Sequence, residues 1–108
     1  MKDDQLYIEH IREAAELILQ FIDGANAELF YANSMMHSAV VRQLEIIGEA
    51  AKHISDSATE HYSDIPWADV KGMRDKLIHD YIEVDLETVW KTAKEDIPDL
   101  LKKLSVNV

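Results

Sequence analysis

Residues 34–55, SMMHSAVVRQLEIIGEAAKHIS, form the stretch that decides the fold. Apolar side chains recur in it at steps of three and four residues, which is the spacing of one face of an α-helix. Asn33 or Ser34 is the expected N-cap of this helix. Gly48 interrupts the pattern at a cost of about 1 kcal/mol relative to alanine, so we expect a neighbouring helix to cross it closely. The apolar positions are Met36, Ala39, Val40, Leu44, Ile47, Ala50, Ala51 and Ile54.

Three further stretches carry the same helical pattern, at about residues 4–22, 66–80 and 85–104. Pro98 must kink or restart the last of them, because proline has no backbone N–H. No stretch shows the alternation of a strand. The sequence therefore predicts an all-α fold, an antiparallel four-helix bundle in which residues 1–108 form a single domain.

The sequence also predicts where these helices begin and end. Asp3 or Asp4 suits the N-cap of the first helix, and Asp85 suits that of the last. Pro66 suits the first turn of the third helix, where a missing N–H costs nothing. The polar residues 56–65 predict a loop, and residues 25–31 predict a linker with room for a short turn.

Composition narrows the classes of function. The net charge of −10 disfavours broad, nonspecific binding of nucleic acid, which needs a basic surface. The chain has no cysteine, which excludes disulfides and thiolate metal sites. It has no apolar run near the ~20 residues that span a bilayer, and its acidic N-terminus does not suit a signal peptide. We expect a cytoplasmic protein that does not enter membranes.

Residues 74–81, RDKLIHDY, carry the candidate chemistry. Arginine binds phosphate through a planar fork of donors, and histidine transfers protons near neutral pH. Arg74 and His79 together could cleave a phosphodiester without a metal. Asp75 lies four residues before His79 on the same helix face, where a carboxylate could orient the imidazole.

The helix geometry separates these groups. At about 100° per residue, Tyr81 returns to within about 20° of Arg74, whereas His79 lies about 140° away. Either the helix ends near His79 and the chain changes direction, or two copies of the chain each supply half of a cleft. The second explanation predicts a homodimer. A structural explanation stays open as well, in which Arg74–Asp75 and Lys76–Asp80 are ordinary surface ion pairs. In that explanation His79 is a structural histidine that bonds a carbonyl.

The motif and its surroundings resemble a known family. Residues 74–81 match the R-x4-H-x-Y motif of HEPN domains, in the HepT toxin-like branch, and residues 39–52 resemble the second helix of that family. The resemblance extends over Ile8 to Leu101, with Gln43 standing where we expect asparagine. Shorter matches occur at residues 65–67, 72–74, 84–86 and 89–90.

This resemblance implies a HEPN four-helix bundle that dimerises and places the motif in a cleft between protomers. It implies a toxin that is a metal-independent endoribonuclease, needs no cofactor and cleaves transfer or messenger RNA. It also implies a partner, an antitoxin that is a minimal nucleotidyltransferase (MNT) and adenylylates Tyr81. By their chemistry, His79 would be the acid and base, Arg74 the stabiliser of the phosphate charge, and Asp75 a support for His79. The expected product has a 2′,3′-cyclic phosphate.

Two other functions were weighed. A di-iron bundle needs Glu-x-x-His motifs on two helices, and none of the five histidines has a glutamate three residues before it. Glu49 and His53 are four apart, which is more typical of a helix surface pair. The second alternative is a noncatalytic HEPN module that serves as partner and substrate of the nucleotidyltransferase. For the nuclease, Arg42, Lys71 and Lys76 are candidates for a local basic patch, and Arg42 could instead pair with Glu45 and Glu49.

Overall fold

A computed structural model describes residues 2–79 and 85–106, without the side chains of residues 2, 74, 76–79 and 106. Every regular element in these two ranges is helical, so the all-α prediction is confirmed. The elements are α1 (Lys2–Phe21), α2 (Ala27–Ala32), α3 (Ser34–Lys52), α4 (Asp56–His61), α5 (Trp67–His79), α6 (Leu86–Lys91), the π-helix η2 (Thr92–Asp96) and α7 (Ile97–Val106).

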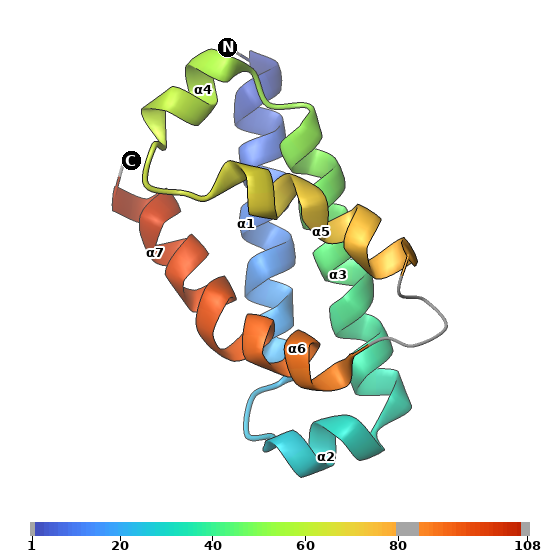
Figure 1. Ribbon diagram of the computed structural model, residues 1–108. Coiled ribbons are helices and arrows are strands. Elements are labelled where there is room, and N and C mark those ends of the chain that lie inside the picture. The colour runs from blue at the N-terminus through green and yellow to red at the C-terminus, as the bar shows by residue number, and fades with distance from the viewer. Residues whose placement is uncertain (1, 80–84, 107–108) are drawn as a thin grey trace.

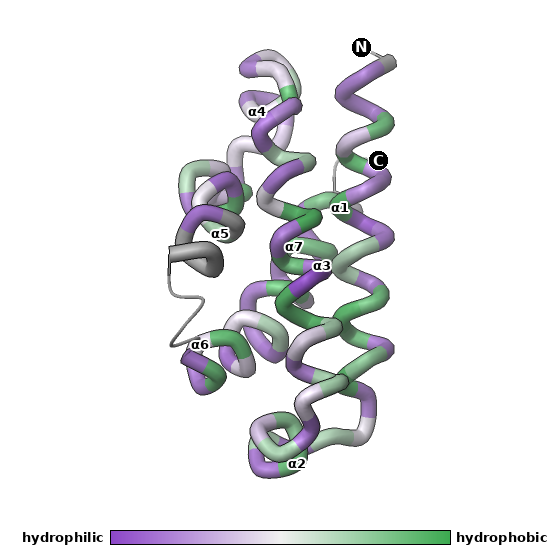
Figure 2. The backbone as a smooth tube through the Cα atoms, turned by 90° about the vertical axis from the view of Figure 1, so that its right-hand side faces the viewer, coloured by the Kyte–Doolittle hydropathy of each residue, from purple (hydrophilic) through white to green (hydrophobic). Residues whose placement is uncertain are grey.

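The body of the molecule is elongated, with extents of 41 × 29 × 19 Å. In Figure 1, α1, α3 and α7 run along its length, and α1 is antiparallel to α3. Helix α6 lies across the lower part of the body, and η2 leads from it into α7. The short helices α2 and α4 cover opposite ends of the body. Helix α5 crosses obliquely, and Figure 2 shows it nearly end-on beside α3. The motif helix is therefore held mainly by its crossing with α3.

One apolar core joins the long helices. Six of the eight predicted apolar positions of residues 34–55 are buried, and Gly48 is buried among them, as a close crossing would require. Figure 2 shows apolar and polar residues alternating around α1 and α3. The largest wholly buried side chains are Phe30, Ile11, Ile18, Ile47, Ile97, Leu104 and Val40.

The connection between α1 and α3 is more structured than a linker. Gly24 ends α1 with φ +76°, a conformation that glycine adopts without strain. Asn26 then caps α2 by accepting a hydrogen bond from the Leu29 backbone N–H at 2.8 Å. Phe30 is wholly buried, with its ring centroid 5.1 Å from that of Trp90. Phe30 therefore packs α2 against the rest of the fold.

The predicted loop 56–65 was wrong in its first half, because residues 56–61 form α4. Ser55 caps that helix by accepting from the Ala58 N–H at 3.3 Å. The prediction that Asp3 or Asp4 caps the first helix was also wrong, because α1 begins at Lys2 and both residues lie in its first turn. The buried carboxylate of Asp4 instead accepts from the Ser55 backbone N–H at 2.8 Å and from the Ser55 hydroxyl at 2.7 Å. These two bonds, the backbone bond most of all, lower the pKa of Asp4 and tie α1 to the start of α4.

The other caps agree with the predictions. Asn33 caps α3 by accepting from the Met36 N–H, and Asp85 caps α6. Pro98 lies in the first turn of α7, so the last helix restarts there as expected. The restart is made by the π-helix η2, in which the Ile97 N–H donates to the Thr92 carbonyl, five residues before it. The segment thus stays helical through a proline.

Candidate active site on α5

The first half of α5 is anchored in the core. The helix begins at Trp67, directly after Pro66, whose carbonyl accepts from the Val70 N–H at 3.1 Å. Trp67 is only 9% exposed, and its indole N–H donates to the Tyr62 carbonyl at 3.0 Å. Val70 is buried behind it. The start of the motif helix is therefore fixed both by packing and by a hydrogen bond.

Helix α5 carries Arg74, Asp75 and His79 on one continuous stretch of helical backbone. Arg74 and His79 are thus five positions apart on the helix, which places their backbones about 7.5 Å apart along the axis and about 140° apart around it. This agrees with the predicted separation of the two groups. The side chains of Arg74 and His79 lie outside the described part of the structure, and so does all of Tyr81.

Asp75 has a partner that the sequence did not suggest. Its carboxylate Oδ1 accepts from Nζ of Lys52, the last residue of α3, at 3.0 Å. Both side chains are partly exposed, Lys52 at 34% and Asp75 at 57%. The pair joins α3 to α5 immediately after Arg74. No local spacing rule could reveal it, because the two residues are 23 apart in the chain.

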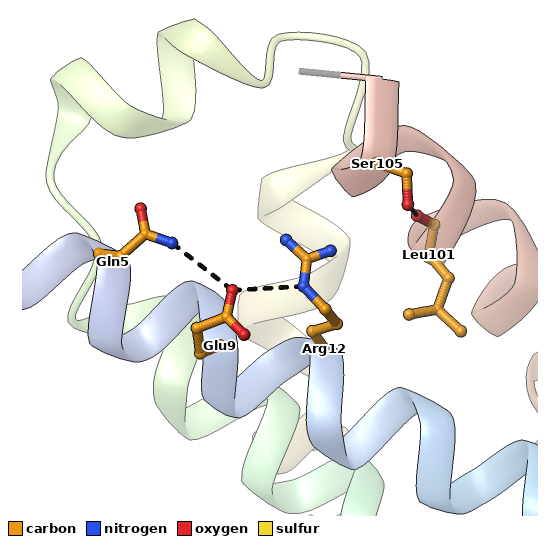
Figure 3. Close-up of polar contacts among 5 residues, drawn as sticks. All are labelled: Gln5, Glu9, Arg12, Leu101 and Ser105. Carbon is orange, nitrogen blue, oxygen red and sulfur yellow. Dashed lines mark hydrogen bonds and ion pairs between the residues drawn. The ribbon is translucent and has the colours of Figure 1, made fainter. Parts of the chain in front are cut away.

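The remaining two of the three arginines are held within their own helices. Arg12 Nε lies 3.3 Å from the Glu9 carboxylate on α1, and Figure 3 shows Glu9 between Gln5 and Arg12. Arg42 Nη1 lies 3.7 Å from the Glu45 carboxylate on α3. The predicted pairing of Arg42 with Glu45 is confirmed.

Arg42 also lines a shallow cleft of about 390 Å³ between α1 and α3. Tyr7 and His53 stack in this cleft with ring centroids 4.9 Å apart, and His53 Nε2 lies 3.6 Å from Glu49. The predicted surface pair of Glu49 and His53 is thus confirmed. The polar residues of the cleft are Tyr7, His10, Arg42, Glu45, Glu49 and His53.

Among the described residues, no group of three or more histidine and carboxylate side chains is arranged to hold a metal ion. Within the same part of the chain, no helix combines the length and apolarity needed to cross a membrane.

Comparison with known proteins decides the family. Residues 11–106 match the family described as Ribonuclease HepT-like. This chain belongs to the HepT-like family. The resemblance inferred from residues 74–81 and their surroundings is therefore confirmed.

Individual HepT-like relatives match along nearly the whole chain. It is 47% identical to the Probable ribonuclease HepT of Thermococcus cleftensis, over 90% of this chain and 88% of that protein. It is 39% identical to a protein of Caldanaerobacter subterraneus subsp. tengcongensis named "Putative RNase TTE0752", over 96% of this chain and 93% of that protein. No solved structure matches the chain.

Proposed function

We propose that this HepT-like protein is an endoribonuclease whose active centre is the R-x4-H-x-Y segment of α5. The observation that carries the proposal is the placement of Arg74 and His79 on one helix, at the spacing of the motif, in a chain that belongs to a ribonuclease family.

The chemistry uses the nucleophile that RNA itself carries. His79 removes the proton of the 2′-hydroxyl, or returns one to the leaving 5′-oxygen, since imidazole titrates near neutral pH. Arg74 stabilises the charge that develops on the phosphorus oxygens. No step in this scheme needs a metal ion. The products are a 2′,3′-cyclic phosphate and a free 5′-hydroxyl.

The geometry of α5 favours a homodimer as the active form. The backbone positions of Arg74 and His79 on α5 lie about 140° apart around the helix axis, so a single helix does not by itself bring the two residues to one small group. A second copy can place the partner's His79 across from Arg74, and can also supply the second proton-transfer group that general acid–base cleavage requires. We propose that two HEPN-type bundles assemble in this way.

We further propose that the protein is the toxin of a toxin–antitoxin pair. Its antitoxin would be a minimal nucleotidyltransferase that transfers AMP to the Tyr81 hydroxyl. In the sequence, Tyr81 follows His79 by two residues and Arg74 by seven, so it belongs to the same motif segment. An added nucleotide brings bulk and a negative phosphate beside the arginine, which would block binding of RNA.

A noncatalytic module is the competing function, and the acidity of the chain favours it. With a net charge of −10, the protein lacks the basic surface through which most proteins capture RNA. Such a module would keep Tyr81 as the substrate of the nucleotidyltransferase and would cleave nothing.

Cleavage of RNA by the purified protein in the presence of EDTA separates the two functions. We expect His79→Ala to lower kcat about 10²–10⁴-fold, and Arg74→Ala to lower it about 10²–10³-fold. His53→Ala is the matched control, because His53 is half exposed and lies on another helix in the cleft between α1 and α3. Full cleavage by His79→Ala would refute the nuclease assignment, and a requirement for a divalent metal would refute the mechanism.

The antitoxin is tested by mass spectrometry. After incubation with the nucleotidyltransferase and ATP, Tyr81 should gain mass in multiples of AMP, and Tyr81→Phe should gain none. A modified protein that still cleaves RNA at the original rate would contradict the proposed silencing.

A further inference from the structure

Two different kinds of contact hold the two halves of α5. Up to Val70 the helix is fixed by buried apolar side chains and by the bond from Trp67 to the Tyr62 carbonyl. Met73 extends this packing, because it is partly buried against the same core. At Asp75, beside Arg74, an ion pair with Lys52 adds a polar contact between α5 and α3 at the protein surface.

We propose that Lys52 is a positioning residue for the active centre and acts through Asp75. The inference rests on the proposed ribonuclease activity. Asp75 follows Arg74 directly and precedes His79 by about one helical turn. Any rotation or shift of α5 at Asp75 is thus passed to both catalytic residues through the helical backbone. By holding Asp75 at 3.0 Å, Lys52 sets the position of both against α3.

Lys52 and Asp75 lie far apart in the sequence, which supports a role in positioning one helix against another. Among the residues that the structure describes, four other ion pairs join residues only three or four apart, so they reinforce a single helix: Arg12–Glu9, Arg42–Glu45, His53–Glu49 and Lys103–Asp99. The pair of Lys52 and Asp75 instead connects two helices that are 23 residues apart at this point. A contact between elements fixes their relative placement, which a contact within one helix does not do.

The expected effect falls on catalysis more than on stability. Partly exposed ion pairs contribute little to folding, because water and salt screen them. Catalysis is more sensitive, because a shift of about 1 Å in a reacting group can cost up to about 10²-fold in rate. A residue that positions the motif should therefore change kcat while the unfolding temperature changes little.

The chain offers a closely matched control for this test. Lys103 pairs with Asp99 at 2.8 Å on α7, and the two side chains are 31% and 54% exposed, against 34% and 57% for Lys52 and Asp75. Lys52→Met and Lys103→Met each keep the aliphatic stem and remove the ammonium group. Both variants lose one positive charge and one partly exposed lysine–aspartate pair, which joins two helices at Lys52 and lies within one helix at Lys103.

The experiment measures kcat and KM for RNA cleavage and the unfolding temperature of the wild type, Lys52→Met, Lys52→Arg and Lys103→Met. We expect Lys52→Met to lower kcat roughly three- to tenfold, Lys52→Arg to restore most of it, and Lys103→Met to match the wild type. A wild type that cleaves no RNA would refute the nuclease itself. With an active wild type, two results would overturn the positioning role: an unchanged kcat in Lys52→Met, or a rise in KM alone, which would make Lys52 an RNA-binding residue.

Discussion

Truncating Phe30 tests whether α2 is part of the folded core. Phe30 is wholly buried and packs against Trp90, Tyr31 and His37. A buried aromatic side chain removes about 150–250 Å² from water. At about 25 cal/mol per Å² this is worth about 4–6 kcal/mol as an upper value, because the unfolded chain already buries part of that area. We therefore expect Phe30→Ala to lower the free energy of unfolding by about 4 kcal/mol, within the usual range for this substitution.

Such a loss is a large part of the free energy of unfolding of a typical domain, which is about 5–15 kcal/mol. Urea unfolding followed by far-ultraviolet circular dichroism gives the free energy, and we expect the unfolding temperature to fall by roughly 15 °C or more. Leu29→Ala is the control on the same helix, because Leu29 is 48% exposed and should cost less than about 1 kcal/mol. If Phe30→Ala cost no more than Leu29→Ala, the packing of α2 described above would be wrong.

Two further predictions concern Asp4 and the glycines. The hydrogen bond from the Ser55 backbone N–H, followed by that from its hydroxyl, lowers the pKa of Asp4, so the folded state favours the carboxylate. The stability that this gives should be complete above about pH 4 and should disappear as the pH falls through the lower folded pKa. In urea unfolding at neutral pH, the free energy of unfolding of the wild type should exceed that of Asp4→Asn. A difference in this free energy that persists undiminished in acid would contradict the argument. Gly24→Ala should destabilise the protein by about 1 kcal/mol, because φ at this position is +76°. Gly72→Ala on α5 should instead stabilise it by up to about 1 kcal/mol, because nothing lies within 4 Å of an added Cβ. Changes of the same sign in the free energy of unfolding of the two variants would refute this argument.

Local signals in the sequence are sufficient to predict much of the fold. The caps at Asn33 and Asp85 and the apolar face of residues 34–55 depend on groups only two to four positions apart, and the structure contains them. The same local reasoning predicts that Asp3 or Asp4 is the N-cap of the first helix, and for Asp4 the structure shows a different role. Its true partner, Ser55, is 51 residues away, and only the packing of α1 against α3 brings the two together.

The same limit explains what was missed around the candidate site. The order and spacing of Arg74, Asp75 and His79 are readable in the sequence, and α5 carries them as expected. Lys52 could not be recognised, because its relation to Asp75 arises where the end of α3 meets α5. Helix α2 was read as a linker for a similar reason. Its six residues are too few to show a clear period, and its main support is the distant ring of Trp90.

The π-helix η2 changes how residues are counted along the C-terminal segment. Val89, Ala93 and Ile97 follow one another at steps of four, and each such step drifts about 40° around a regular α-helix. All three are nevertheless buried, because the wider turn at Thr92–Asp96 takes up the drift. A related chain with one residue fewer in this stretch would wind as an ordinary α-helix and present the same faces to the core. A single-residue gap at this point between two HepT-like sequences would then record a change of helical winding, with no loop gained or lost.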